Sequence, residues 1–301
     1  MPTPSTGAKR IVKRIYYRIR NNQWVYLNLV NFQEKRFVKK NLGSSLSSTE
    51  ERILLDLRSN GIAFSSLLEI FPERDYLSEF QKWIEKNESN LRQRSKKKFL
   101  LSYYGTDAPD REIDLSNPFV KFYLNDKVLS IACKYLGYLP QLFEVYIEKT
   151  VPLSDNTPQF SQNWHRDPEE KRTLKIFVYL NDVDENSGPF TYVKKSAPSN
   201  KGSYSPLFPQ DLPWGSYPSA SDVQKSVAKE DLVVATAKQG TVIFCDTSGL
   251  HKGGHAVSNF RIMSTGFYPS MHYTEPRPFA TPKSTLLEKE FSNLAKAVLK
   301  K

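Results

Sequence analysis

The sequence has few cysteines and no long apolar run, and both absences narrow the class of protein. Only two of the 301 residues are cysteine, Cys133 and Cys245, which is too few for a disulfide framework. A reducing compartment is therefore the simpler expectation. No apolar run approaches the length that spans a bilayer, and no signal-peptide pattern is present. We expect a globular protein, because 39% of the residues are hydrophobic and can form a core. The expected location is cytoplasmic, with peripheral membrane contact as an open addition.

Acidic residues are almost missing from the first part of the chain. Residues 1–42 contain ten Lys or Arg and a single acid, Glu34, so this segment carries +9 of the net charge of +11. The other residues together carry only +2 and are close to neutral. The basic character therefore belongs to an N-terminal segment and not to the body of the protein.

Between residues 8 and 31, apolar and aromatic side chains interleave with the basic ones at helical spacing, which predicts a short amphipathic helix. Three interpretations of residues 8–40 remain open. They could make peripheral contact with an anionic membrane surface, contact nucleic acid through stacked aromatic rings, or pack on the body with a solvated basic side. Nucleic acid is the least favoured, because no recognised binding motif accompanies the basic residues.

Helices are predicted first along the chain and strands after them. A capping box at 48–51 (STEE) starts a helix that ends at Gly61, a second covers 76–90, and a third runs from Pro118 to about Gly137. Short strands separated by turn residues are predicted from residue 142 onward, over 143–149, 160–165, 174–181, 190–193, 232–235, 241–245 and 261–268.

Many short strands with no helix between most of them argue for an antiparallel jelly roll. The expected fold class is α+β, with a double-stranded β-helix core and N-terminal helices packed on one sheet. We expect a basic segment over 1–42, a jelly-roll domain with helical support over 43–283, and a C-terminal basic amphipathic helix over 284–301. The loop at 197–229, rich in Pro, Ser and aromatic residues, is long enough to cover a site.

The stretch 162–168 (QNWHRDP) places His165 and Asp167 two residues apart at the end of a predicted strand. Side chains alternate along an extended backbone, so these two point to the same side and can share one metal ion. His251, which follows the strand TVIFCD and a turn, can supply a third ligand. Two imidazoles and one carboxylate form the facial set that holds ferrous iron and leaves the other side open for chemistry.

Arg261 opens the apolar strand RIMSTGF ten residues after His251. A buried guanidinium there could grip a carboxylate of a second ligand. Each signal is weak by itself, because His-x-Asp occurs often by chance. Together they predict a metal site with an anion site beside it.

This arrangement resembles the phytanoyl-CoA dioxygenase family of Fe(II)/2-oxoglutarate oxygenases over about residues 55–270. Besides the ligands, the similar stretches are LRSNG at 57–61, ACKYLG at 132–137 and LNDVDENSGP at 180–189. The chain departs from the family where members usually show a Pro-Gly-Ser-His turn, since it has KKSA at 194–197.

The resemblance implies a cupin-like jelly roll, with His165, Asp167 and His251 as iron ligands and Arg261 as the partner of the distal carboxylate of 2-oxoglutarate. It implies Fe(2+), 2-oxoglutarate and O2 as cofactor and co-substrates, with ascorbate as a possible reductant. Asp167 favours hydroxylation or a related oxidation, because relatives that halogenate carry a small residue in its place to admit a halide.

Further site residues are expected near these four. Lys149 and Tyr146 lie on the strand before the motif, where relatives often place polar contacts to 2-oxoglutarate, although Lys149 is equally compatible with an outward-facing lysine. Tyr179 shares one face of its strand with Lys175, so both could line the same pocket. Arg166 lies between two ligands and is expected to point away from the iron, toward the substrate or an acidic neighbour.

The function expected from the resemblance is hydroxylation of a C–H bond in a small or lipid-linked organic substrate, with release of succinate and CO2. The partner is then a small molecule, with peripheral membrane contact through residues 8–40 as an open addition. The alternative is a noncatalytic jelly-roll adaptor that uses its basic segment to bind a membrane or nucleic acid. The sequence predicts neither the substrate nor the oligomeric state.

Overall fold

The computed structural model describes residues 7–20, 22–43, 45–93, 97–105, 112–153, 157–168, 170–200, 202–209 and 216–300. Its centre is a seven-stranded antiparallel sheet in the order β1-β8-β5-β10-β4-β3-β2. The strands are β1 (Ile62–Ser66), β2 (Arg92–Gln93), β3 (Leu100–Gly105), β4 (Glu144–Thr150), β5 (Leu174–Tyr179), β8 (Thr241–Asp246) and β10 (Arg261–Tyr268).

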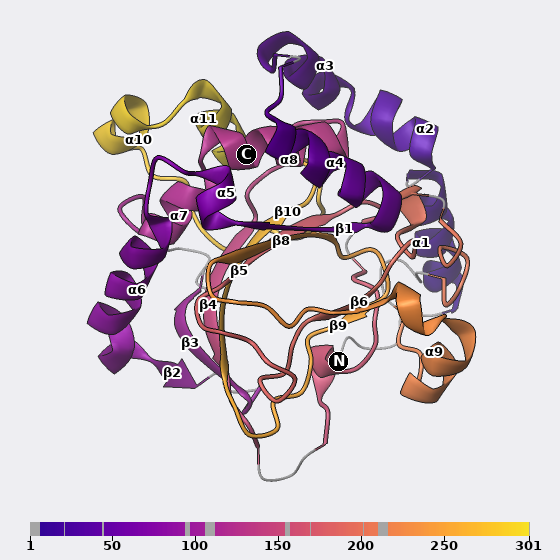
Figure 1. Cartoon of the computed structure of the whole chain (residues 1–301). Coiled ribbons are helices and arrows are strands. Elements are labelled where there is room, and N and C mark those ends of the chain that lie inside the picture. Colours follow the sequence, from indigo (N-terminus) through magenta and orange to yellow (C-terminus); the bar gives the residue numbers. More distant parts are fainter. Residues whose placement is uncertain are drawn as a thin grey trace.

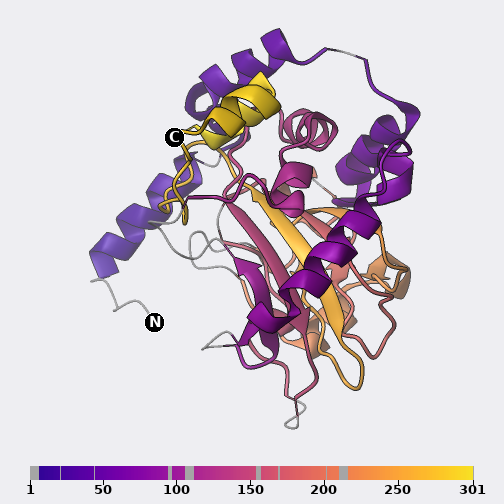
Figure 2. The ribbon, with the colours of Figure 1, turned by 90° about the vertical axis from the view of Figure 1, so that its left-hand side faces the viewer.

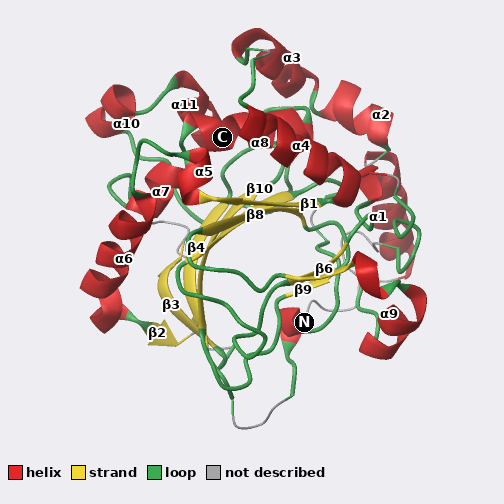
Figure 3. Cartoon of the chain, in the orientation of Figure 1, coloured by secondary structure: helices red, strands yellow, loops and turns green. Residues whose placement is uncertain are grey.

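A smaller antiparallel sheet has the order β7-β6-β9 and faces the large sheet (Figures 1 and 3). Its strands are β6 (Thr191–Val193), β7 (Leu232–Val234) and β9 (His251–Lys252). Two facing antiparallel sheets with helices on the outside of one of them form the predicted α+β jelly roll, so the fold prediction is confirmed.

Helices cover the outer face of the large sheet (Figures 1 and 3). They are α4 (Ser48–Asn60), α5 (Leu67–Ile70), α6 (Tyr76–Asn87), α7 (Pro118–Tyr123), α8 (Asp126–Leu136), α10 (Thr285–Glu290) and α11 (Asn293–Leu299). Alternation along β4 explains the two faces of this sheet. Val145 and Ile147 enter the core with the helices, whereas Tyr146 and Glu148 face the interior of the jelly roll.

Helix ends follow local side-chain chemistry. The capping box of α4 is formed by Ser47 and Glu50, one residue earlier than predicted, and Gly61 ends the helix with φ 82°. A side chain at Gly61 would also meet the Tyr192 hydroxyl, at 2.3 Å from its Cβ. The predicted helix from Pro118 to Gly137 is two helices, because the Asn125 side chain caps the start of α8. Likewise, residues 284–301 contain two short helices instead of one.

The strand predictions are confirmed for six segments within one or two residues at each end. The prediction for 160–165 is wrong, because residues Phe160–Gln162 form a 3-10 helix. Gln159 and Gln162 exchange backbone and side-chain hydrogen bonds around this turn. Strands β1, β2, β3 and β9 were not predicted. The long loop at 197–229 contains a 3-10 turn (Pro198–Asn200) and α9 (Ala220–Ser226).

The N-terminal segment contains α1 (Gly7–Arg20), α2 (Gln23–Val25), a π-helix (Tyr26–Val30) and α3 (Phe32–Asn41). Buried Glu170 ties it to the body: its carboxylate accepts hydrogen bonds from Arg20 Nη2 at 3.0 Å and from the Tyr26 hydroxyl at 2.6 Å. The Ser270 backbone N–H and hydroxyl each donate to the same carboxylate at 2.7 Å. None of the described helices is both long and apolar enough to cross a membrane.

Candidate metal centre

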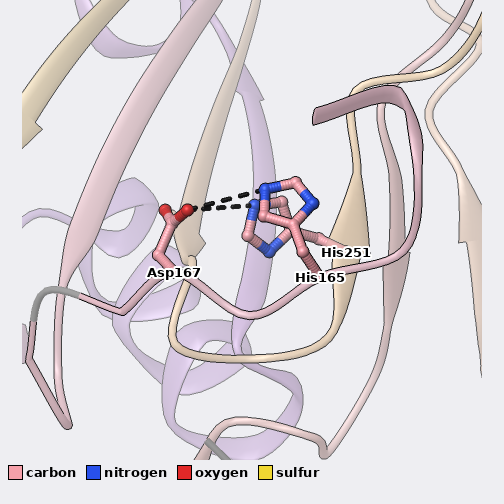
Figure 4. Close-up of side chains that lie close together, drawn as sticks. All are labelled: His165, Asp167 and His251. Atoms are coloured by element: carbon pink, nitrogen blue, oxygen red, sulfur yellow. Dashed lines mark ion pairs between the residues drawn. The ribbon is translucent and has the colours of Figure 1, made fainter. Parts of the chain in front are cut away.

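The structure brings His165, Asp167 and His251 together on the inner side of the jelly roll (Figure 4). Asp167 Oδ1 lies 3.6 Å from His165 Nε2 and 3.8 Å from His251 Nε2. Two atoms that each bind one metal ion at about 2.1 Å lie roughly 3 Å apart when their bonds are perpendicular. A small inward movement of these three buried side chains would therefore enclose one ion.

The backbone sets both imidazoles in the same tautomer. His165 Nδ1 lies 2.9 Å from the Asn163 carbonyl oxygen, and His251 Nδ1 lies 2.9 Å from the Gly249 carbonyl oxygen. A carbonyl oxygen only accepts, so each Nδ1 carries the proton and each Nε2 keeps its lone pair for a metal. The two histidines also pair through their own backbones, with N–O distances of 2.8 and 2.9 Å.

Lys175 on β5 orients the carboxylate. Its ammonium donates to Asp167 Oδ2 at 2.6 Å, while Oδ1 is the oxygen that faces the two imidazoles (Figure 4). One carboxylate oxygen is thus fixed by the protein and the other is presented to the metal position. Groups that hold a ligand in this way raise metal affinity without touching the metal.

Electrostatics favour the protonation states that bind a cation. Burial raises the pKa of Asp167, but the Lys175 ammonium and the two imidazoles outweigh burial and hold it well below its ordinary value. Burial, reinforced by His165, lowers the pKa of His251 to about 3. At neutral pH the centre therefore contains an ionised carboxylate beside a neutral His251, as metal ligation requires.

The turn before His251 is built around buried Asp246. Its carboxylate accepts hydrogen bonds from the Tyr135 hydroxyl at 2.7 Å and from the Ser248 hydroxyl at 2.6 Å. Gly249 is required by close packing, because a Cβ there would lie 2.0 Å from the Tyr192 hydroxyl oxygen. This packing holds the carbonyl that orients His251.

A cavity of about 350 Å³ opens beside the three candidate ligands, and Arg261 is among the residues that line it. The Arg261 guanidinium donates from Nη1 to the Gly188 carbonyl and from Nη2 to Thr150 Oγ1 at 3.3 Å. Its Nε is buried without a hydrogen-bond partner among the described residues. Burial lowers the pKa of Arg261, but the group stays charged at neutral pH because its ordinary value is so high. A buried guanidinium with an unused donor fits a carboxylate.

The other predicted site residues divide between the two faces of the large sheet. Tyr146 and Lys175 line the cavity. Lys149 lies on the opposite face, where its ammonium is 3.8 Å from Glu88 and 4.6 Å from the Phe260 ring centroid. Tyr179 is buried beside Arg261 but outside the cavity lining, and its hydroxyl donates to the Ala235 carbonyl at 3.0 Å.

Arg166 points away from His165, Asp167 and His251, as predicted, but among the described residues it neither lines the cavity nor pairs with an acid. Glu169, the acidic neighbour expected for it, lies outside the described residues. It is fully buried and donates five hydrogen bonds of 2.6–3.2 Å to backbone carbonyls, those of Ser196, Tyr204, Leu207, Phe208 and Ser248. Burial lowers the pKa of Arg166 to about 10, so the group remains charged at neutral pH. Arg166 therefore fastens the long loop to the segment that carries His165 and Asp167, a role that sequence analysis missed.

The departure at 194–197 keeps the turn geometry that glycine would favour. Lys195 has φ 58°, a left-handed conformation that is uncommon for a residue with a side chain. Ser196 closes the turn by donating to the Val193 carbonyl at 2.6 Å and accepting from Leu250 N at 2.8 Å. Thus the KKSA turn is anchored next to the segment that carries His251.

No protein-family model matches the sequence, and no curated protein sequence matches it. Solved structures do match the fold. The epimerase SnoN, in complex with Fe3+, alpha ketoglutarate and nogalamycin RO, has a TM-score of 0.54 at 12% identity, over 79% of this chain and 96% of that one.

EctD from S. alaskensis, with 2-oxoglutarate and 5-hydroxyectoine, has a TM-score of 0.53 at 14% identity, over 84% of this chain and 87% of that one. HygX from Streptomyces hygroscopicus, with nickel, 2-oxoglutarate and hygromycin B bound, has a TM-score of 0.50 at 14% identity, over 76% and 90%. At such identities the likeness establishes the jelly-roll fold alone.

Proposed function

We propose that this chain is an Fe(II)- and 2-oxoglutarate-dependent oxygenase of the phytanoyl-CoA dioxygenase type. Its reaction is hydroxylation of a C–H bond in a small or lipid-linked organic substrate, with release of succinate and CO2. The observation that carries the proposal is the placement of His165, Asp167 and His251 around one point, in a cavity that also contains the guanidinium of Arg261. The proteins of similar fold that hold Fe3+ or nickel together with alpha ketoglutarate support it.

Each residue has a distinct task in this proposal. His165 and His251 hold the iron through Nε2, and Asp167 holds it through Oδ1. When bound, the iron supplies the oxidative chemistry, with 2-oxoglutarate and O2 as co-substrates and ascorbate as a possible reductant. Arg261 anchors the far carboxylate of 2-oxoglutarate, and Lys175 keeps Asp167 in the orientation that faces the metal.

The cavity lining supports a small organic substrate. Five aromatic side chains and two glutamates of β4 also line the cavity. These are Phe99, Tyr146, Phe177, Phe190, Phe267, Glu144 and Glu148. A volume of about 350 Å³ lies at the lower end of ordinary small-molecule sites. Burial of the metal side chains keeps bulk water away from the centre, which strengthens every electrostatic contact inside it.

The direct test is succinate release. Purified protein with added Fe(II), 2-oxoglutarate, ascorbate and O2 is expected to form succinate slowly, and faster when a library of candidate substrates includes an accepted one. Metal binding without any succinate from any candidate would favour the alternative, a noncatalytic jelly-roll adaptor.

Arg261→Leu is expected to raise the KM for 2-oxoglutarate by about 100-fold, because a buried charge-assisted pair between guanidinium and carboxylate is lost. Arg261→Lys keeps the charge but not the fork, so its effect should be intermediate. Fe(II) binding, measured by titration without oxygen, should be nearly unchanged in both variants. An unaltered KM in Arg261→Leu would remove the assignment of this residue.

Lys175→Met is expected to weaken Fe(II) binding by roughly 10- to 100-fold, because Asp167 loses the group that orients it. The matched control is Lys238→Met, which removes a lysine that pairs with Asp182 at 2.7 Å on the surface. Direct metal titration of both variants makes the comparison. Equal affinities would show that Lys175 does not position the ligand.

A further inference from the structure

Helix α1 exposes an apolar face to solvent. Five of its side chains are 53–66% exposed, namely Ile11, Val12, Ile15, Tyr16 and Ile19. Their spacing of one, four, five and eight residues from Ile11 places them on a single side of the helix. Exposed apolar surface of this kind on a folded protein marks an interaction site more often than chance.

The opposite side of α1 is fixed to the body, so the apolar face cannot turn inward. Tyr17 and Arg20 are buried and lie three residues apart, on one side of the helix. The Tyr17 hydroxyl is 3.1 Å from Thr274 Oγ1. Arg20 forms a buried ion pair with Glu170 at 3.0 Å and donates to the His272 carbonyl at 2.7 Å. Figure 2 shows α1 at the edge of the molecule, with its first turn projecting away from the sheets.

Cationic side chains border the apolar face. Lys13, Arg14 and Arg18 are all exposed, and the sequence contains no acid from residue 1 to residue 33. Further along the segment, Trp24 and Leu29 are also largely exposed, at 64% and 60%. Apolar residues beside cationic residues of the same helix, with an exposed tryptophan further along the segment, are features of a helix that lies in the plane of an anionic lipid surface.

We propose that α1 is a membrane-docking helix that inserts Ile11, Ile15 and Ile19 into the headgroup boundary of an anionic bilayer while Arg14 and Arg18 contact lipid phosphates. The face is a convex helix side, so it suits a fluid surface that closes around it. Nucleic acid would neutralise the arginines but leave five apolar side chains in water. The positive charge beside the apolar face favours an anionic lipid surface, because each basic residue near such a surface adds electrostatic attraction.

The test is flotation of the full-length protein with phosphatidylserine/phosphatidylcholine vesicles and with pure phosphatidylcholine vesicles. The wild type is expected to bind the anionic vesicles and to bind the neutral ones far more weakly. Ile15→Asp/Ile19→Asp should weaken binding to anionic vesicles by more than about tenfold, because two inserted side chains become charged. Arg14→Gln/Arg18→Gln should weaken it by roughly tenfold, through lost attraction to the lipid charge.

The matched control is Leu55→Asp/Leu68→Asp, which makes the same chemical change at two leucines that are 65% and 73% exposed elsewhere on the surface. This variant should float like the wild type. Three results would overturn the proposal. One is no binding of the wild type to anionic vesicles. Another is binding that the isoleucine variant retains in full, which would mean a contact by surface charge alone. The last is self-association of the wild type that the isoleucine variant abolishes without any vesicle binding, which would assign the face to a second copy of the chain.

Discussion

Replacing Asp167 with alanine is expected to abolish stoichiometric Fe(II) binding and to lower succinate formation by at least about a thousandfold. Losses of this size are typical when a residue that the reaction requires is removed. The variant loses one of the three proposed ligands. It also leaves the Lys175 ammonium, which pairs with Asp167 at 2.6 Å in the wild type, beside two imidazoles without the carboxylate that stands between them. Because that arrangement repels a cation, the loss of affinity should exceed the loss of one ligand alone. Metal titration and succinate release measure the two effects.

The chain offers a closely matched control for this change. Asp182 also pairs with a lysine, Lys238, at 2.7 Å, but both side chains are exposed. Asp182→Ala should bind Fe(II) and form succinate as the wild type does. Thermal unfolding of both variants separates loss of the metal from loss of the fold. Full Fe(II) affinity in a folded Asp167→Ala protein would remove this residue from the metal centre.

Replacing Arg166 with alanine is expected to lower the free energy of unfolding by about 3–5 kcal/mol, as loss of a buried charged group with all its partners does. Five carbonyl oxygens lose their donor at once, and three of them belong to residues 204–208. This loop should therefore become sensitive to proteases before the rest of the protein. Arg166→Lys keeps the charge but cannot reach five acceptors, so it should also be strongly destabilised.

Denaturant unfolding makes the measurement, and Arg52→Ala is its control. Arg52 donates to Phe64 O at 2.8 Å and to Glu69 at 2.7 Å, but its side chain is 42% exposed. Loss of such a surface contact should change stability by less than about 1 kcal/mol. If Arg166→Ala unfolded no more easily than Arg52→Ala, the proposed role of Arg166 in holding the loop would be wrong.

The jelly roll was predictable because most of its strands are short apolar segments bounded by turn residues. Strand β10, for example, was placed at residues 261–268 and occupies Arg261–Tyr268. Turn residues at both ends of this segment and apolar residues in its middle define where the strand begins and ends. The segment 160–165 shows the limit of such reasoning, since Phe160 has φ 48° and opens a 3-10 turn. Its aromatic residue resembles a strand residue in the sequence but is 55% exposed in the fold.

The side of a strand on which a residue lies could be predicted only in part. Tyr146 and Lys149 are three residues apart on β4, so alternation places them on opposite faces. Both were predicted near 2-oxoglutarate, and the register of β4 against β10 brings only Tyr146 to the cavity. Alternation alone predicts that the two side chains lie on opposite faces of the sheet. Which of them faces inward depends on the neighbouring strands.

The roles of Lys175 and Arg166 depend on contacts between distant parts of the chain. Lys175 meets a carboxylate eight residues earlier only because β5 turns back beside the ligand segment. Arg166 meets carbonyls from 30 to 82 residues away. No local sequence pattern predicts the hydrogen-bond partners of either residue. By contrast, His165 and Asp167 lie within one three-residue motif, so that part of the site could be predicted from the sequence.

The central claim is that these residues bind Fe(II) and 2-oxoglutarate together. Its most direct test is a calorimetric titration of 2-oxoglutarate into the protein without oxygen, in the presence and absence of Fe(II). One molecule of 2-oxoglutarate should bind per chain in the presence of Fe(II), and binding should be far weaker without the metal or in Arg261→Leu. Binding that ignores the metal, or no binding at all to a folded protein that holds Fe(II), would contradict the proposal that these residues form an oxygenase site.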